Sequence, residues 1–137
     1  GPAAYPGYME MPLNQKVSLA QFDTIQRLAK KEPCVIVGRC ADYALAAHKN
    51  LVSVFICADL DDKIARICEL YQLPKDKAMD QILKTDKKRA NYYNYYSNKK
   101  WGGAASYDLC LNSSRIGLDG AVDMILNYLD VRESHQK

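Results

Sequence analysis

The sequence lacks any hydrophobic run that approaches the ~20 residues a membrane-spanning helix requires, although 48% of its 137 residues are hydrophobic. It opens without a recognisable signal peptide, and it contains no internal repeat or low-complexity segment. A strong excess of one charge is also missing, because the net charge is only +3. Such a charge does not by itself indicate a nucleic-acid partner. We therefore expect one water-soluble globular domain with no membrane partner.

Paired cysteines are missing as well. None of the five cysteines has a neighbour at the C-x-x-C spacing of a zinc or redox site, and an odd number argues against a disulfide framework. The five are Cys34, Cys40, Cys57, Cys68 and Cys110, and most of them lie inside apolar segments. We interpret them as reduced core residues, which favours a cytoplasmic protein.

Apolar patterns predict strands that alternate with helices. The expected strands are Cys34–Val37, Leu51–Cys57 and Tyr107–Leu111. The expected helices run from Gln15, capped by Asn14, to just before Pro33, over Ala41–Ala47, from a cap at Asp59 through Tyr71 until Leu73-Pro74, over residues 76–99, and through Ala121–Leu129. Alternation of this kind predicts a parallel sheet covered on both faces. Residues 1–14 are interpreted as an extended lead-in, with Gly1-Pro2 as a scar of tag removal, and residues 15–137 as the domain.

The first expected strand delivers an arginine at its carboxyl end. Cys34–Val37 is apolar and rich in β-branched residues, and it ends abruptly at Gly38-Arg39. Ligands of open α/β sheets bind outside the carboxyl ends of the strands, where a planar guanidinium can bind a phosphate with two parallel hydrogen bonds. Arg39 is therefore a candidate phosphate ligand. The alternative is an arginine that caps a turn or pairs with Asp42.

The long helix carries the densest charge. Its segment Lys84–Arg89 places Lys84, Lys88 and Arg89 within two turns, and Asp86 can pair with Arg89 at the i, i+3 spacing. Interleaved tyrosines follow directly, from Tyr92 to Tyr96. Cations beside aromatic rings are typical of single-stranded nucleic-acid binding, and also of a flap that closes over a nucleotide phosphate. A solvated charged face with packed tyrosines is the third interpretation.

Five motifs together resemble the cytidylate kinase-like family, a branch of the nucleoside monophosphate kinases. They are Cys34–Asp42 (CVIVGRCAD), Val54–Ala58 (VFICA), Lys84–Tyr96 (KTDKKRANYYNYY), Lys100–Gly102 (KWG) and Leu111–Ser114 (LNSS). The resemblance extends over nearly the whole chain from about Pro12. It implies a P-loop kinase-like α/β fold, in which a parallel sheet carries helices on both faces as three layers.

The resemblance also implies roles for individual residues. Arg39 matches the arginine that binds the acceptor nucleotide, and Asp86, Arg89 and Tyr93 match the lid pattern acid-x-x-Arg-x-x-x-Tyr, with residues 76–103 as the lid. Arg66 resembles the base of that lid, and the segment that contains Asn112 lies near the donor nucleotide. We accordingly assign catalysis to Arg66, Lys84, Asp86 and Arg89, substrate binding to Arg39, Asp42, Lys88 and Tyr93, and cofactor binding to Asn112 and Ser113, with no metal ligand.

One family motif is missing from the sequence. No Gly-x-x-x-x-Gly-Lys-[Ser/Thr] loop, which would cradle the donor phosphates, occurs in it. We therefore expect a truncated fold without the first strand, P-loop and first helix, which is inactive alone. The full-length parent would use ATP and Mg²⁺ to phosphorylate CMP or dCMP.

Two further functions stay open, so whether this chain is itself an enzyme is left undecided. One is a non-catalytic nucleotide-binding or regulatory module, and the other is a single-stranded nucleic-acid binder that uses the Lys/Tyr segment. The missing strand would also expose a sheet edge, from which we expect self-association.

Overall fold

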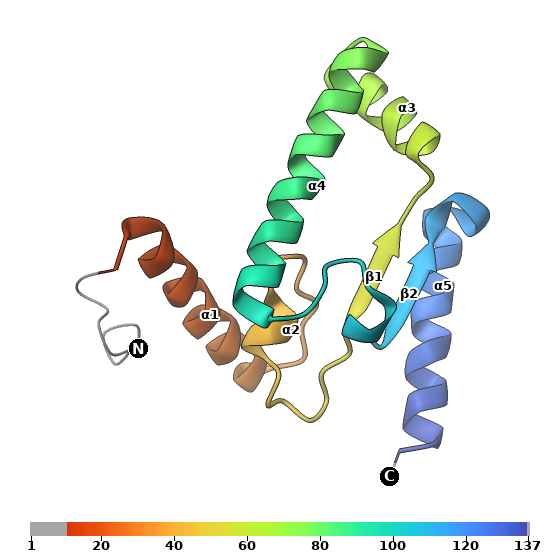
Figure 1. Cartoon of the computed structure of the whole chain (residues 1–137). Helices are drawn as coiled ribbons and strands as arrows, with labels where there is room; N and C mark the ends of the chain where they lie inside the picture. The colour runs from red at the N-terminus through yellow and green to blue at the C-terminus, as the bar shows by residue number, and fades with distance from the viewer. Residues whose placement is uncertain (1–10, 137) are drawn as a thin grey trace. The chain divides into compact units, whose positions relative to one another are not determined.

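Helices account for most of the regular structure (Figure 1). The computed structural model describes residues 11–136. The chain divides into two compact units, residues 1–52 and 53–137, and each is described by itself. Most of the expected lead-in, residues 1–14, lies outside the described residues. Among the helices of residues 11–136, none is both long enough and apolar enough to cross a membrane.

The first unit contains α1 (Leu13–Lys31) and the short α2 (Ala41–Ala44). A hydrogen bond and an aromatic contact join the two helices. The Gln26 side chain donates to the Ala44 carbonyl over 3.0 Å. The Phe22 ring, which is buried, meets Tyr43 edge-on at a centroid distance of 5.5 Å. These contacts hold α2 against α1.

The predicted N-cap of α1 is wrong. The helix begins at Leu13 with Pro12 at the cap position, because proline has no N–H to leave unsatisfied and its fixed φ suits a helix start. The Pro12 carbonyl accepts the first helical hydrogen bonds, from the amides of Gln15 and Lys16. Asn14 lies inside the first turn, where its Oδ1 accepts from the Gln15 amide over 2.9 Å.

The predicted strand Cys34–Val37 is also wrong. The segment has no strand pairing in the described structure, and Val35 and Val37 are 93% and 88% exposed. An apolar, β-branched run identifies a segment that can pair but does not supply the neighbouring strand, and a strand needs one to satisfy its backbone. The same absence of cover explains why Cys34 is exposed and not in a core.

The second unit is built on β1 (Val54–Cys57) and β2 (Leu109–Asn112), which pair in parallel. Val54 lies opposite Leu109, and Cys57 lies opposite Asn112. These are the only two strands paired within residues 11–136, so the parallel sheet is confirmed but its expected size is not. Both sides of such a small sheet are incompletely covered, which leaves Cys57 and Cys110 exposed and corrects their assignment to the core.

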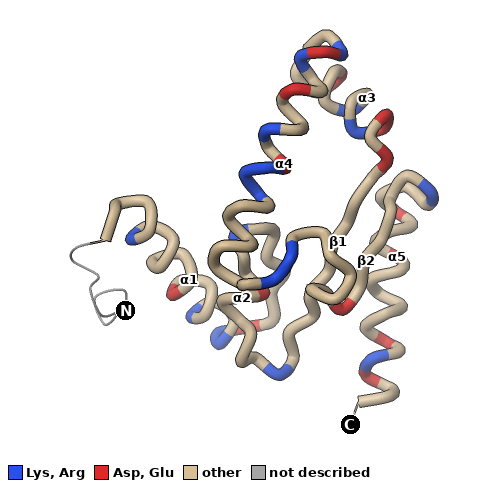
Figure 2. The backbone as a smooth tube through the Cα atoms, viewed as in Figure 1, with Lys and Arg blue, Asp and Glu red and all other residues tan. Residues whose placement is uncertain are grey.

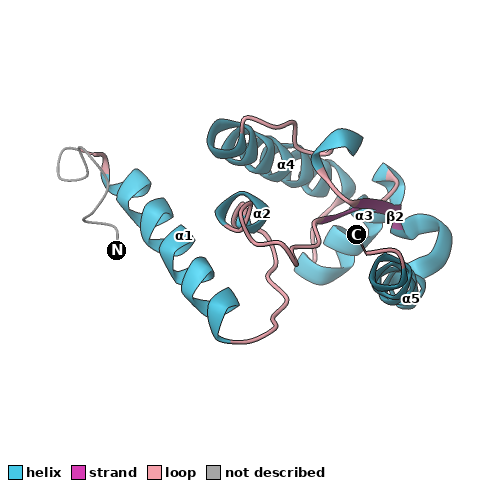
Figure 3. Ribbon diagram, turned by 90° about the horizontal axis from the view of Figure 1, so that it is seen from below, coloured by secondary structure: helices cyan, strands magenta, loops and turns pink. Residues whose placement is uncertain are grey.

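Helix α5 (Ser113–Ser134) lies alongside the strands (Figures 1 and 3) and contacts both of them. Its first turn is separated from the rest by Gly117, whose φ of 71° and ψ of 177° interrupt the helix. That conformation is restricted to glycine in practice. The kink allows a short turn to cover the strand ends before the main helix runs back along the sheet.

Helices α3 (Leu60–Tyr71) and α4 (Lys75–Ser97) form a hairpin that extends from β1 (Figure 1). The two helices pack against each other. Ala78 and Ile82, one turn apart on α4, are buried. The turn at the tip uses Gln72 in the left-handed conformation, with a φ of 53°. The bounds of α4 confirm the predicted long helix.

Four aromatic rings fix the end of α4 to β1. This aromatic cluster consists of Phe55, Tyr93, Trp101 and Tyr107. Phe55 on β1 contacts Trp101, with ring centroids 5.1 Å apart, and Tyr107, with ring centroids 4.9 Å apart. Tyr93 on α4 stacks on Tyr107 at a centroid distance of 5.7 Å.

The loop that follows α4 approaches Phe55 closely at Gly102. This residue has a φ of 76°, and a Cβ there would lie 3.5 Å from the ring of Phe55. Hydrogen bonds from Trp101 N–H to Asn94 Oδ1 (2.7 Å) and from Gly102 N–H to the Tyr107 hydroxyl (3.0 Å) hold the loop.

The aromatic cluster predicts the effect of replacing Phe55. Phe55→Ala removes two ring contacts from a half-buried site, so we expect the free energy of unfolding to fall by about 2 kcal/mol. Phe55→Leu keeps most of the apolar volume and should lose less. Urea unfolding of both variants measures the difference. A loss below about 0.5 kcal/mol for Phe55→Ala, the range of ordinary surface substitutions, would contradict a central role for the cluster.

The exposed Cys34–Val37 segment predicts self-association. Two exposed valines on an unpaired extended segment favour pairing with another chain. Replacing both with serine (V35S/V37S) should shift the association midpoint to higher protein concentration without lowering stability, since neither side chain is buried. Light scattering over a dilution series measures this. Val17→Ser, at a half-exposed position on α1, is the control, and an equal shift in both variants would refute the prediction.

Candidate functional site

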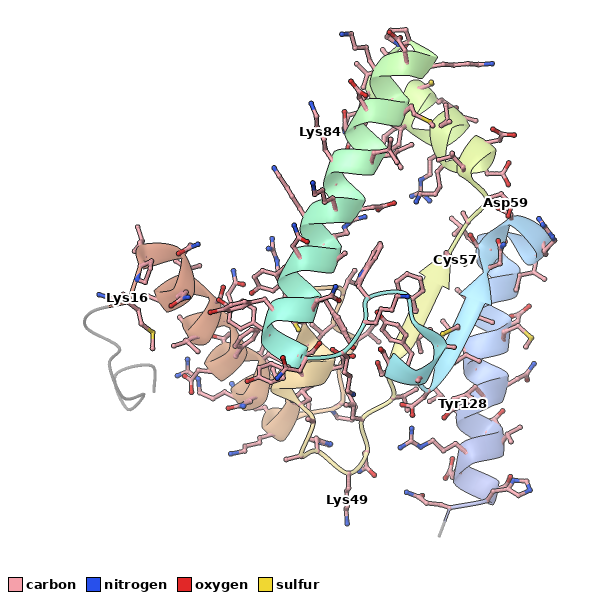
Figure 4. All side chains as sticks on the ribbon, in the orientation of Figure 1. Lys16, Lys49, Cys57, Asp59, Lys84 and Tyr128 are labelled. Atoms are coloured by element: carbon pink, nitrogen blue, oxygen red, sulfur yellow. The ribbon has the colours of Figure 1, made fainter. Side chains whose placement is uncertain are left out.

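The carboxyl ends of β1 and β2 are joined by a polar cluster, here called the carboxyl-edge network: Asp59, Asn112, Ser113, Ser114 and Arg115. Asp59 follows β1 and is labelled in Figure 4. Its carboxylate accepts a hydrogen bond from Asn112 Nδ2 (3.0 Å) on one oxygen and from Arg115 Nη1 (2.5 Å) on the other. Its amide donates to Ser114 Oγ over 2.8 Å. Two segments that are distant in sequence are thus held at one edge of the sheet.

Asn112 and Ser113, the predicted cofactor-binding residues, both belong to this network. Asn112 caps α5 by accepting from the Ser114 amide over 2.9 Å while its Nδ2 donates to Asp59. The Ser113 hydroxyl donates to the Cys57 carbonyl over 3.2 Å. Each side chain therefore already has a structural partner, and a ligand here would meet a preformed hydrogen-bonded edge.

Asp59 is ionised at neutral pH, and its charge is already neutralised. The hydrogen bond from Asn112, followed by that from Arg115, holds the pKa of Asp59 below its ordinary value of 3.8. Asp59 in turn raises the pKa of Arg115. A carboxylate that accepts charge-assisted bonds on both oxygens is a poor proton acceptor. We therefore assign Asp59 to positioning the strand ends.

The second cluster lies in the helical hairpin, where Asp86 contacts cations from both helices. Lys63 Nζ, on α3, lies 2.5 Å from Asp86 Oδ2. Arg89 Nη1, one turn along α4, lies 3.7 Å from Asp86 Oδ1. The predicted Asp86–Arg89 pair is thus confirmed. The Arg89 side chain is 64% exposed, whereas that of Asp86 is 25% exposed. Asp86 consequently holds Arg89 only loosely, at a position open to solvent.

The other predicted cations lie exposed on the same hairpin. Lys84 and Lys88 are on α4 and Arg66 is on α3, and all three are exposed. None has an ion pair in the described part of the second unit. Figure 2 shows basic residues at successive levels along α4, and Figure 4 labels Lys84 there. Like charges at this density repel, so an anion that bound among them would relieve repulsion.

The tyrosines of α4 have different environments. Tyr93, a predicted substrate-binding residue, is 5% exposed and stacks on Tyr107 in the aromatic cluster. In this structure its ring therefore packs in the interior of the second unit. Tyr95 is 64% exposed. Tyr96 contacts both Tyr92 and Tyr95, with ring centroids 4.9 Å apart in each pair. The rings thus pack on one another as a group.

In the first unit, Arg39 lies in an unusual turn. Gly38, Arg39 and Cys40 have φ values of 72°, 58° and 55°, and each left-handed non-glycine residue costs about 1–2 kcal/mol. Backbone strain of this kind accumulates at functional sites. The Arg39 side chain is exposed, and no ion pair joins it to Asp42 within the described residues. Asp42 Oδ1 accepts from the Tyr43 amide over 2.8 Å.

Sequence reasoning missed Lys63 and Arg115. The position of Lys63 in the sequence could have predicted its contact with Asp86. Lys63 lies ten residues before Leu73, at the tip of the hairpin, and Asp86 lies thirteen residues after Leu73. Residues at similar distances from the turn of a helical hairpin face each other. Arg115 has no such local signal. Its proximity to Asp59 follows only once Cys57 is known to lie opposite Asn112.

The residues present do not fit a site for magnesium and donor phosphates. Within residues 11–136, no group of three His, Cys, Asp or Glu side chains is arranged to hold a metal ion. The carboxylates of Asp59 and Asp86 already pair with cations. The sequence also lacks the glycine-rich loop that presents backbone amides to phosphates.

Comparisons with known proteins identify two similarities. The model of the cytidylate kinase-like family matches residues 3–115. A crystal structure of an uncharacterized protein from Eubacterium ventriosum ATCC 27560 is 37% identical, with a TM-score of 0.83. The similarity covers 90% of this chain and 70% of that one. A comparison with curated proteins gave no match.

The carboxyl-edge network predicts a specific pH dependence of stability. Because the pKa of Asp59 is lowered in the folded state, its contribution is complete above the unfolded carboxyl value and is lost as pH falls through the folded value. Asp59→Asn should therefore be less stable than wild type at neutral pH, and this difference should shrink at about pH 3. Urea unfolding at both pH values tests this, with Asp61→Asn on the exposed start of α3 as control. A difference that is independent of pH would contradict the assignment.

Proposed function

Since the chain belongs to the cytidylate kinase-like family, we propose that it supplies the acceptor-binding and lid portion of a kinase whose full-length parent phosphorylates CMP or dCMP. One observation supports this most strongly. The α3–α4 hairpin carries exposed Lys84, Lys88 and Arg66, and it holds an exposed Arg89 beside the half-buried Asp86. Exposed cations oriented by one carboxylate suit the charge of a phosphoryl group during transfer.

Each unit carries its own set of proposed ligand-binding residues. Arg39 binds the acceptor phosphate, because its guanidinium is exposed on a strained turn and has no ion pair in the described first unit. Asp42 belongs to the same acceptor-binding segment. Arg66, Lys84 and Arg89 neutralise charge on the transferring group, with Lys88 contributing to substrate binding and Asp86 orienting Arg89.

We further propose that the fold is of the P-loop kinase type, with a larger three-layer sheet than the two strands described. The parallel pairing of β1 with β2 supports this, as does the extended, exposed Cys34–Val37 segment. ATP with magnesium is the proposed donor. Because the residues present do not fit a donor site, this chain alone is expected to bind the acceptor without transferring phosphate to it.

A single-stranded nucleic-acid binder is the competing function. The exposed Tyr95 beside the cations of α4 favours it. However, Tyr96 contacts both Tyr92 and Tyr95, whereas base stacking needs separate ring faces. The two functions differ in salt dependence, since contacts with many phosphates weaken steeply as salt increases.

Calorimetric titration with CMP tests the proposal. Arg39→Ala should raise the Kd about 10- to 100-fold, because a charge-assisted hydrogen-bond pair contributes about 1.5–3 kcal/mol. Alanine at the left-handed position carries the same kind of backbone strain as arginine, so stability should change little.

The control is Arg27→Ala, a largely exposed arginine on α1 paired with Asp23. It removes the same charge from the same unit. Equal CMP affinity in wild type and Arg39→Ala would refute the acceptor role. Tighter binding of an oligonucleotide than of CMP, with a steep salt dependence, would favour the competing function instead.

A further inference from the structure

Asp86 is shared unequally between two cations. Lys63 reaches it from α3 at 2.5 Å on Oδ2, while Arg89 lies 3.7 Å from Oδ1. The Lys63 and Asp86 side chains are 33% and 25% exposed, whereas Arg89 is 64% exposed. Charges withdrawn from water attract each other more strongly than exposed ones. Lys63 is therefore the main partner of Asp86, and Arg89 is a secondary one.

The neighbours of Asp86 on α4 determine which cation would pair with it if Lys63 were absent. Side chains three and four positions away are those a helical residue can contact. At these positions stand Ile82, Leu83, Arg89 and Ala90, so Arg89 is the one charged neighbour on α4. If Lys63 were absent, the half-buried carboxylate would need a cation. Asp86 would then form a close ion pair with Arg89, held by two hydrogen bonds. Alternatively, it would pair with Arg66, which lies one turn from Lys63 on α3.

We propose that Lys63 is a positioning residue that, through Asp86, keeps Arg89 available for a nucleotide phosphate. This inference rests on the proposed function, in which the hairpin cations bind phosphoryl oxygens. Lys63 neutralises the carboxylate from the neighbouring helix, so Asp86 orients the guanidinium without capturing it. An anion that arrives can then displace the 3.7 Å contact without first breaking a tight ion pair.

A simple clamp between α3 and α4 is the alternative role for the Lys63–Asp86 pair. Removing either partner would then loosen the hairpin, and removing both would not repair it. Under our proposal, the double variant should bind phosphate better than K63Q alone does. The neutral amide that D86N introduces cannot form an ion pair with Arg89, so the guanidinium stays available. The double variant K63Q/D86N also has the same net charge as wild type, which separates local positioning from general electrostatic attraction.

The experiment is a calorimetric titration of the 137-residue chain with inorganic tripolyphosphate at fixed ionic strength. We expect K63Q to weaken binding about tenfold, and K63R to restore it. K63Q/D86N should bind at least about threefold more tightly than K63Q, although less tightly than wild type because Asp86 no longer orients Arg89. Lys77→Gln removes the same charge from an exposed position on α4 and should cost no more than about twofold by loss of general attraction.

The outcomes separate this inference from the function on which it rests. Wild type that fails to bind tripolyphosphate, or an Arg89→Ala variant that binds it as wild type does, would refute the phosphate role of the hairpin. If both behave as proposed but K63Q matches K77Q, only the positioning role of Lys63 is refuted. A double variant as weak as K63Q would identify a structural clamp and overturn the proposal.

Discussion

The packing of Phe55 against Trp101 and Tyr107 is the contact on which the second unit depends. Each strand of the sheet has four residues, and a two-stranded sheet is marginally stable by itself. The aromatic cluster compensates by fixing the end of α4 and the following loop to β1. Because Tyr93 of α4 stacks on Tyr107, the base of the helical hairpin is held to the strands. The hairpin cations extend from this base.

Two carboxylates illustrate how similar ion pairs serve different purposes. Asp59 is bonded on both oxygens by Asn112 and Arg115, and so joins the ends of β1 and β2. Asp86 is bonded closely on one oxygen and loosely on the other, and leaves a guanidinium in solvent. The first arrangement uses its charges internally. The second leaves a cation for an outside anion, which supports a phosphate-binding role for the hairpin.

The first unit contains a turn with a strained backbone, at Gly38, Arg39 and Cys40. Arg39 and Cys40 are held in left-handed conformations beside Gly38, although neither side chain favours them. The preceding extended segment has no pairing partner in the described structure, and its valines are exposed. A turn that is costly to maintain, next to a segment ready to pair, is consistent with an acceptor loop in a larger sheet.

The sequence alone determined the long helices and one ion pair within a helix. Helical periodicity predicted α4 and α1 closely, and the i, i+3 spacing predicted the Asp86–Arg89 pair. The tertiary structure decided the rest. Whether Cys34–Val37 formed a strand depended on a neighbour that an apolar pattern does not encode, and the partners Lys63–Asp86 and Asp59–Arg115 lie 23 and 56 residues apart. Spacing fixes which side chains share a face of one element, whereas contacts between elements depend on how the elements pack together.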